Sequence, residues 1–281
     1  MIYRTLIDSR SLNAHLDAPG WIVVDCRFDL ADPEAGRAAY RAGHIRGARY
    51  AHLDEDLSGP TTPRSGRHPL PAPSRLAHTL GQWGIGDTTQ VVVYDSSNGA
   101  MAVRLWWLLR WLGHKRCALL DGGLPAWQRE GLPVTAKQPT VMATKISDRH
   151  NDALWVDSES VLANIDRGED LLIDARGAPR YRGDEEPLDP VAGHVPGAVN
   201  LPLTGNLGPD GCFSGATTLR ERFMAALDGK SSKRVVHMCG SGVTACHNLL
   251  AMEVAGLTGS RLYAGSWSEW IRDPNRPVAK D

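Results

Sequence analysis

The chain has 281 residues, of which 42% are hydrophobic, and a formal net charge of −1. This length suffices for one large domain or two of ordinary size. The balanced charge gives no reason to expect nucleic acid or a membrane surface as a partner. No apolar run is long enough to span a bilayer, and the N-terminal residues lack the apolar core of a signal peptide, so we expect a soluble cytoplasmic protein.

The cysteines and histidines are scattered along the chain. There are five cysteines without any CxxC pair: Cys26, Cys117, Cys212, Cys239 and Cys246. This odd, unpaired set excludes a disulfide framework and a zinc knuckle, and it indicates reduced thiols. The ten histidines contain no HExxH motif and no cluster with ligand spacing. We therefore expect neither a metal nor another cofactor.

Strands and helices alternate along the first half. Apolar runs predict buried strands, and longer amphipathic or apolar patterns predict helices. The strands are expected at 21–27, 91–95 and 118–121, and the helices at 33–41, 74–83, 102–112 and 124–130. A Gly-His turn at 43–50 leads into a further short strand. The stretch 59–73 holds five prolines and two glycines, so we expect it to be irregular.

The second half repeats this plan, as its motifs show. The matching segments are 170–176 with 22–27, 193–198 with 43–48, 235–239 with 91–95, and 261–266 with 118–123. Strands that alternate with helices predict an α/β fold with a mostly parallel sheet flanked by helices in each half. We expect tandem domains at 1–137 and 151–281, joined by a polar linker at 138–150.

The stretch around Cys239 stands out. A predicted strand ends at this cysteine, a loop of small residues follows, and a helix then runs to a glycine stop at Gly256. The helix start presents unpaired N–H groups and positive potential, which favour the thiolate and its reactivity. A buried structural cysteine is the alternative. Ligands of such sheets bind at the carboxyl ends of strands, where Asp95 holds the matching position of the first half. One catalytic copy and one that has lost its chemistry are therefore predicted.

Several motifs together point to a known family. They are the loop Cys239–Ala245, Gly265-Ser266-Trp267-Ser268-Glu269-Trp270, Asp121-Gly122-Gly123 and the two Gly-His turns. From about Trp21 to Val278 the chain resembles the two-domain rhodanese-type sulfurtransferases. The cysteine loop is similar to that of the 3-mercaptopyruvate sulfurtransferases. The resemblance implies two tandem rhodanese-like domains, a non-catalytic N-terminal one and a catalytic C-terminal one.

The resemblance also implies a reaction. The Cys239 thiolate would take sulfur from a small anionic donor and form a persulfide. Cyanide, a small thiol or a thioredoxin-like protein would then accept the outer sulfur. The substrate-binding loop would be Gly240, Ser241, Gly242, Val243 and Thr244, with its N–H groups turned toward the sulfur. Gly240 and Gly242 would supply the backbone angles. The hydroxyls of Ser241 and Thr244 would either contact the substrate or cap the helix.

Arginines are expected to hold the anionic donor. Arg180 lies in Arg180-Tyr181-Arg182-Gly183, which resembles the substrate-binding arginine motif of the family. Its guanidinium would bind a carboxylate bidentately, and the alternative is a surface arginine paired with Asp184 or Glu185. The family usually carries a second arginine before the Gly-His turn, but 187–192 contains none. Arg182 or a residue of the first domain would have to replace it.

Two residues of the first domain are further candidates by resemblance. Arg104 would reach the site, or else lie on a helix surface. His44 would protonate the leaving enolate, or else bond to backbone in its turn. The second role is favoured for His44, because His194 holds the equivalent turn of the other half. Cys246, about two helical turns after Cys239, is expected to be packed rather than to act as a resolving thiol.

Other functions remain open as alternatives. A thiosulfate sulfurtransferase would use the same cysteine with another donor. A dual-specificity phosphatase would need an arginine in the cysteine loop, and none lies between Cys239 and Leu250. A non-catalytic interaction module would be expected to have lost the cysteine.

Overall fold

The computed structural model describes residues 2–281, which form two compact units. The first unit consists of residues up to 59, 70–151 and 210–212, and the second of 60–69, 152–209 and 213–281. The irregular segment Pro60–Pro69 therefore belongs to the second unit, although it lies in the first half of the sequence. Among the described residues, no helix combines the length and apolarity needed to cross a bilayer.

The sheet of the first unit, as far as the chain is described, has five parallel strands in the order β1-β6-β5-β2-β4. Their bounds are Leu6–Ile7 (β1), Trp21–Asp25 (β2), Arg49–Tyr50 (β4), Gln90–Tyr94 (β5) and Cys117–Leu120 (β6). The central β5 is buried along its whole length, because helices cover a parallel sheet on both faces. A separate antiparallel pair joins β3 (His44–Ile45) to β7 (Val134–Thr135).

Within the described residues, five helices accompany this sheet. They are α1 (Ser9–Asn13), α2 (Ala35–Ala42), α3 (Pro73–Gln82), α4 (Ala102–Trp111) and α5 (Gly123–Arg129). The carboxylate of Asp8 caps α1, and a proline opens α3, where a missing N–H costs nothing. All but one residue of α4 is buried, as its mostly apolar sequence predicts.

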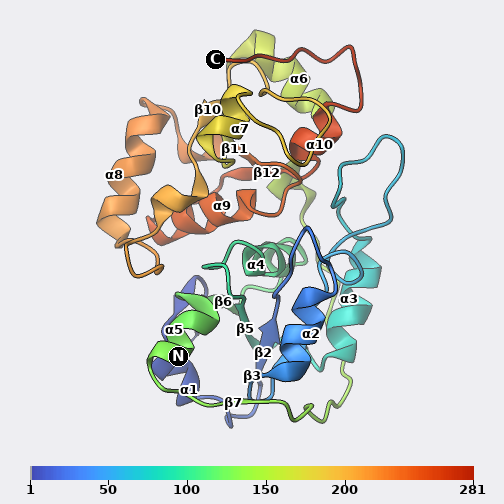
Figure 1. Cartoon of the computed structure of the whole chain (residues 1–281), viewed down its shortest axis with the longest axis vertical. Helices are drawn as coiled ribbons and strands as arrows, with labels where there is room; N and C mark the ends of the chain where they lie inside the picture. The colour runs from blue at the N-terminus through green and yellow to red at the C-terminus, as the bar shows by residue number, and fades with distance from the viewer. Residues whose placement is uncertain (1) are drawn as a thin grey trace. The chain divides into compact units, whose positions relative to one another are not determined.

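The second unit has the same sheet, in the order β10-β9-β11-β12-β8, again all parallel. Its strands are Trp155–Val156 (β8), Leu171–Asp174 (β9), Val199–Asn200 (β10), Val235–Met238 (β11) and Arg261–Tyr263 (β12). Its helices are Ser158–Arg167 (α6), Ala178–Arg182 (α7), Ala216–Leu227 (α8), Ala245–Val254 (α9) and Ser266–Trp270 (α10). Figure 1 draws the helices of each unit around its own strands. The predicted fold, two α/β copies with parallel sheets, is confirmed.

Segment 138–150, proposed as the linker, contains no helix or strand. It is not a loose tether, because its backbone bonds to the first unit. The Thr144 N–H donates to the Gly81 carbonyl at 2.9 Å, and the Arg149 N–H donates to the Leu112 carbonyl at 3.2 Å.

The repeat extends to buried side chains. In the first unit, Arg27 bonds the Asp25 carboxylate at 2.6 Å and the Gly43 carbonyl at 2.7 Å. In the second unit, Arg176 bonds Asp174 at 2.7 Å and the carbonyl of Gly193 at 2.8 Å. Each copy thus ties the end of a strand to its Gly-His turn with a buried ion pair.

A tyrosine supports the histidine of each turn. His44 stacks on Tyr40 with ring centroids 4.0 Å apart, and His194 stacks on Tyr181 at 3.9 Å. In each pair the histidine Nδ1 also lies within hydrogen-bond distance of the tyrosine carbonyl oxygen. This correspondence aligns Tyr40 with Tyr181. The residue before each tyrosine is Ala39 in one copy and Arg180 in the other.

Candidate active site

Cys239 directly follows β11 and is buried, with 1% of its surface exposed. Its N–H donates to the Ser266 hydroxyl at 3.1 Å, and its carbonyl accepts from the Trp267 N–H at 3.0 Å. The next carbonyl, that of Gly240, accepts from the Ser268 N–H at 2.8 Å. The start of α10, the Gly-Ser-Trp-Ser motif, therefore fixes the point at which the chain leaves the sheet.

The two glycines of the loop have different roles. Gly242 has a φ of 74°, and a Cβ there would lie 2.1 Å from the Ala264 carbonyl oxygen. Only glycine fits this position. Gly240 has no positive φ, so the prediction that it supplies an unusual backbone angle is wrong. A Cβ on Gly240 would instead make ordinary contacts of 3.5–3.7 Å with the guanidinium groups of Arg67 and Arg180.

Several loop amides remain available beside Cys239. Among the residues that the structure describes, no hydrogen-bond acceptor is found for the N–H groups of Gly240, Ser241, Val243 and Thr244. Such groups at the start of a helix suit an anion. The expectation that they face a thiolate or a bound donor stays a prediction.

Asp95 shows what the matching position of the first unit does. Its buried carboxylate accepts four backbone N–H bonds of 2.7–2.9 Å, from Ser97, Gly99, Met101 and Ala102. Burial raises the pKa of Asp95, and these bonds oppose the rise. In the first unit, the loop after the central strand thus turns four of its amides toward an acidic side chain.

The Ser241 hydroxyl lies 2.7 Å from Nδ1 of His68, and both side chains are buried. His68 comes from the Pro60–Pro69 segment and was not predicted from the sequence. Thr244 stands at the N-cap of α9 with helical angles and makes no capping hydrogen bond through its side chain. Capping therefore accounts for neither hydroxyl. Val243 is buried and accepts the Cys246 N–H at 3.1 Å.

Arg180 is held by buried carboxylates. Its Nη2 bonds Glu186 at 2.6 Å and Asp189 at 3.3 Å, and its Nε bonds Glu186 at 3.0 Å. Neither predicted surface partner contacts it. Instead, Asp184 forms an exposed ion pair with Arg182 at 2.7 Å. Arg182 is therefore engaged at the surface and does not replace the missing second arginine.

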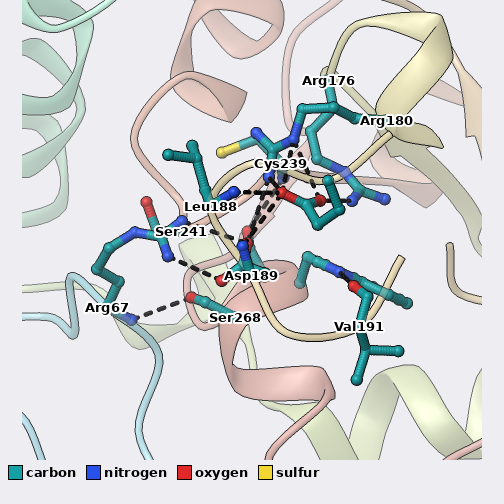
Figure 2. Close-up of polar contacts among 12 residues, drawn as sticks. Arg67, Arg176, Arg180, Leu188, Asp189, Val191, Cys239, Ser241 and Ser268 are labelled. Atoms are coloured by element: carbon teal, nitrogen blue, oxygen red, sulfur yellow. Dashed lines mark hydrogen bonds and ion pairs between the residues drawn. The ribbon is translucent and has the colours of Figure 1, made fainter. Parts of the chain in front are cut away.

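Arg67 brings a second guanidinium to the loop. Its guanidinium bonds the Asp189 carboxylate through Nη1 at 2.8 Å. Its backbone N–H donates to the Ser268 hydroxyl at 3.0 Å. Figure 2 shows Arg67 and Arg180 converging on Asp189 close to Cys239 and Ser241. The only signal for this segment in the sequence is an Arg-His pair within an irregular, proline-rich stretch. No local pattern says where such a stretch packs.

The first-unit candidates have local partners or are buried. Both ring nitrogens of His44 lie within 3.2 Å of backbone carbonyl oxygens, those of Tyr40 and Lys137, as the turn role predicts. Arg104 in α4 is fully buried, so its helix-surface alternative is wrong. That His44 or Arg104 takes part in the reaction at Cys239 remains a prediction. Cys246 is buried with Sγ 3.5 Å from the Gly242 carbonyl, packed as expected.

One group in the first unit has donor atoms close enough for a metal ion: Glu34, His52 and Glu55 lie within 4.8 Å of one another. Arg37 bridges the two carboxylates, at 3.2 Å and 2.5 Å. The His52 Nδ1 accepts backbone N–H bonds, which leaves its proton on Nε2 and removes the lone pair that a metal needs. These residues form an ion-pair network rather than a metal site.

Comparison with known proteins agrees with this architecture. The rhodanese-like domain model matches residues 8–130 and 157–273. A probable 3-mercaptopyruvate sulfurtransferase of Pseudomonas aeruginosa is 48% identical over 98% of this chain and 97% of its own length. A putative thiosulfate sulfurtransferase of Mycobacterium tuberculosis is 39% identical over 92% of this chain and 90% of its own.

A solved structure agrees as well. The 3-mercaptopyruvate sulfurtransferase SseA of Escherichia coli superposes with a TM-score of 0.80 at 30% identity, over 95% of this chain and all of that one. Two matched segments, full-length relatives and a shared fold lead to one conclusion. The chain belongs to the rhodanese-like family and carries one family domain in each half.

Proposed function

We propose that the chain is a 3-mercaptopyruvate sulfurtransferase, which passes sulfur to cyanide or a thiol through a persulfide on Cys239. The observation that carries this proposal is the buried Cys239 thiol, followed by loop amides that have no acceptor among the described residues and by the guanidinium groups of Arg67 and Arg180 at Gly240. The relatives named 3-mercaptopyruvate sulfurtransferase support it.

In the first step the Cys239 thiolate attacks the sulfur of 3-mercaptopyruvate. An S–S bond forms, the C–S bond breaks, and its electron pair passes to the enolate of pyruvate. Cys239 keeps the outer sulfur with its proton. The enolate needs a proton, which the Ser241 hydroxyl can relay because it is bonded to His68. This assigns to His68 the proton-transfer role that the resemblance had suggested for His44.

In the second step a nucleophile attacks the outer sulfur of the persulfide, and the S–S bond breaks as its electron pair returns to the Cys239 thiolate. With cyanide, the outer sulfur leaves as thiocyanate and its proton passes to water. A small thiol or a thioredoxin-like protein would accept the sulfur in the same way. We place the enzyme in the cytoplasm, where acceptors of this kind are reduced, and its five free thiols agree with that location.

Thiosulfate is the second candidate donor. The Mycobacterium tuberculosis relative, named as a putative thiosulfate sulfurtransferase, favours it. Attack on thiosulfate releases sulfite, which leaves without a proton. The loop from Gly240 to Thr244 contains no charged side chain that would add to the attraction for this dianion. Mercaptopyruvate therefore remains the preferred donor.

The first prediction tests the nucleophile. Cys239→Ser should abolish sulfur transfer to cyanide from either donor, whereas Cys246→Ser, the matched control, should retain it. Incubation with donor alone should add one sulfur atom to the wild-type chain by intact mass, and cyanide should remove it. Measuring kcat/KM for the two donors side by side then ranks them.

Residual turnover in Cys239→Ser equal to that of the control would contradict the proposal. Absence of the mass gain with both donors would favour a non-catalytic module.

A further inference from the structure

Six charged side chains are joined beside the Cys239 loop in what we call the charged cluster: Arg67, Asp174, Arg176, Arg180, Glu186 and Asp189. Each arginine pairs with its own carboxylate at 2.6–2.8 Å. The side chains of all three carboxylates are at most 4% exposed. The formal charges of the cluster therefore cancel, although the site is expected to bind an anion.

Asp189 is the centre of this cluster. Its carboxylate accepts from Arg67 at 2.8 Å and from Arg180 at 3.3 Å. Its own N–H donates to Glu186 at 3.2 Å, which orders the turn between the two acidic residues. Asp189 thus positions Arg67, which arrives on an irregular segment, next to the arginine of α7.

Both arginines also have N–H groups that turn toward the loop. Arg180 Nη1 lies 3.6 Å, and Arg67 Nη2 lies 3.5 Å, from the place a Cβ on Gly240 would occupy. Glu186 and Asp189 use only Nε and Nη2 of Arg180, and Nη1 has no acceptor among the described residues. The space beside Gly240, one residue from Cys239, is therefore lined by two guanidinium edges.

We propose that Asp189 and Glu186 select the charge of the sulfur donor: by neutralising Arg67 and Arg180, they favour a monoanion over a dianion. This inference rests on the proposed function and deepens it. A monocarboxylate can accept two N–H bonds from the guanidinium edges and adds one negative charge to a balanced cluster. A dianion such as thiosulfate adds a second charge close to two buried carboxylates and the Cys239 thiolate. Water screens such repulsion weakly in a buried site.

The experiment removes one negative charge at a time. Asp189→Asn keeps the size of the side chain and an oxygen for Arg67. It should raise kcat/KM for thiosulfate relative to mercaptopyruvate by about tenfold, mainly through KM. Glu186→Gln should shift the ratio in the same direction, and it serves if Asp189→Asn does not fold. Glu185→Gln is the matched control, because Glu185 is an exposed neighbour that bonds neither arginine.

A binding measurement needs no turnover. Calorimetric titration of Cys239→Ser with pyruvate, a monoanion, and with sulfate, a dianion, should show the same relative gain for sulfate when Asp189→Asn is added. An unchanged sulfate-to-pyruvate ratio, or an equal shift in Glu185→Gln, would overturn the inference. Lack of a persulfide in the wild-type chain would remove the proposed function instead, and the titration would still decide whether the cluster selects charge.

Discussion

Asp95 and Cys239 occupy the same place after the central strand of each copy, with different chemistry. The Asp95 carboxylate accepts four N–H groups of its own loop, so these amides are not available to a ligand. In the loop after Cys239, several amides have no acceptor among the described residues. The neighbouring arginine differs too, because Ala39 stands where the second copy has Arg180. These two positions, Asp95 or Cys239 after the central strand and Ala39 or Arg180 before the tyrosine, thus account for much of the difference between the two copies.

His68 offers a second prediction at this scale. His68→Asn should lower kcat with mercaptopyruvate by about a hundredfold, because the enolate loses its proton relay through Ser241. The rate with thiosulfate should change far less, since sulfite leaves without a proton. Single-turnover release of pyruvate and of sulfite would measure both. Equal slowing with the two donors would show that His68 acts on the loop rather than on the proton.

At the scale of elements, the Cys239 loop is fixed by its neighbours. The start of α10 bonds the loop's first carbonyls, and Ala264, directly after β12, leaves no room for a side chain at Gly242. The Pro60–Pro69 segment also packs closely, because a Cβ on Gly66 would lie 2.6 Å from the Gly265 carbonyl oxygen. Close approach of irregular segments, rather than helix or strand formation, builds this site.

The loop glycines should therefore respond differently to alanine. Gly240→Ala should leave the thermal midpoint nearly unchanged and raise KM for the donor by about tenfold, because its methyl group occupies the space between Arg67 and Arg180. Gly242→Ala should cost about 3 kcal/mol or more and lower kcat, because it combines a positive φ with a backbone clash. Thermal unfolding and steady-state kinetics would check both. A normal KM in Gly240→Ala would contradict the assigned donor position.

At the scale of the whole molecule, duplication produced two sheets with one strand order but different buried groups. His237 on β11 is fully buried where the first copy has Val93. Burial lowers the pKa of His237 to about 3 from its ordinary 6.5. The folded state therefore keeps His237 neutral, whereas the unfolded chain takes up a proton below pH 6.5.

This burial should make stability depend on pH. Because the folded pKa is depressed, the full stability is present above about pH 6.5 and falls as the pH drops toward 3. His237 should account for about 2 kcal/mol of the decrease in the free energy of unfolding between pH 7 and pH 5. His237→Val, which copies the first unit, should lose correspondingly less over that interval. Urea unfolding of both proteins at the two pH values would measure this, and parallel losses would refute it.

The sequence by itself determined the repeat, the alternation of strands and helices, and the place of Cys239 between strand and helix. These features depend on local periodicity and on residues adjacent in the chain, so they can be read without tertiary contacts. The motif around Arg180 was also visible. The carboxylates that pair with Arg180 could not be predicted, because Glu186 and Asp189 lie in an irregular turn whose path depends on packing.

Only the tertiary structure decided that Arg67 lies beside Arg180 and that Ser241 has a histidine partner. These contacts join residues 122 and 173 positions apart, through a segment that the first half of the chain contributes to the second unit. A proline-rich segment without periodicity has no local preference that would indicate its neighbours. Its position follows from close backbone approach at Gly66 and from the charge of Asp189, which exist only once the chain has folded.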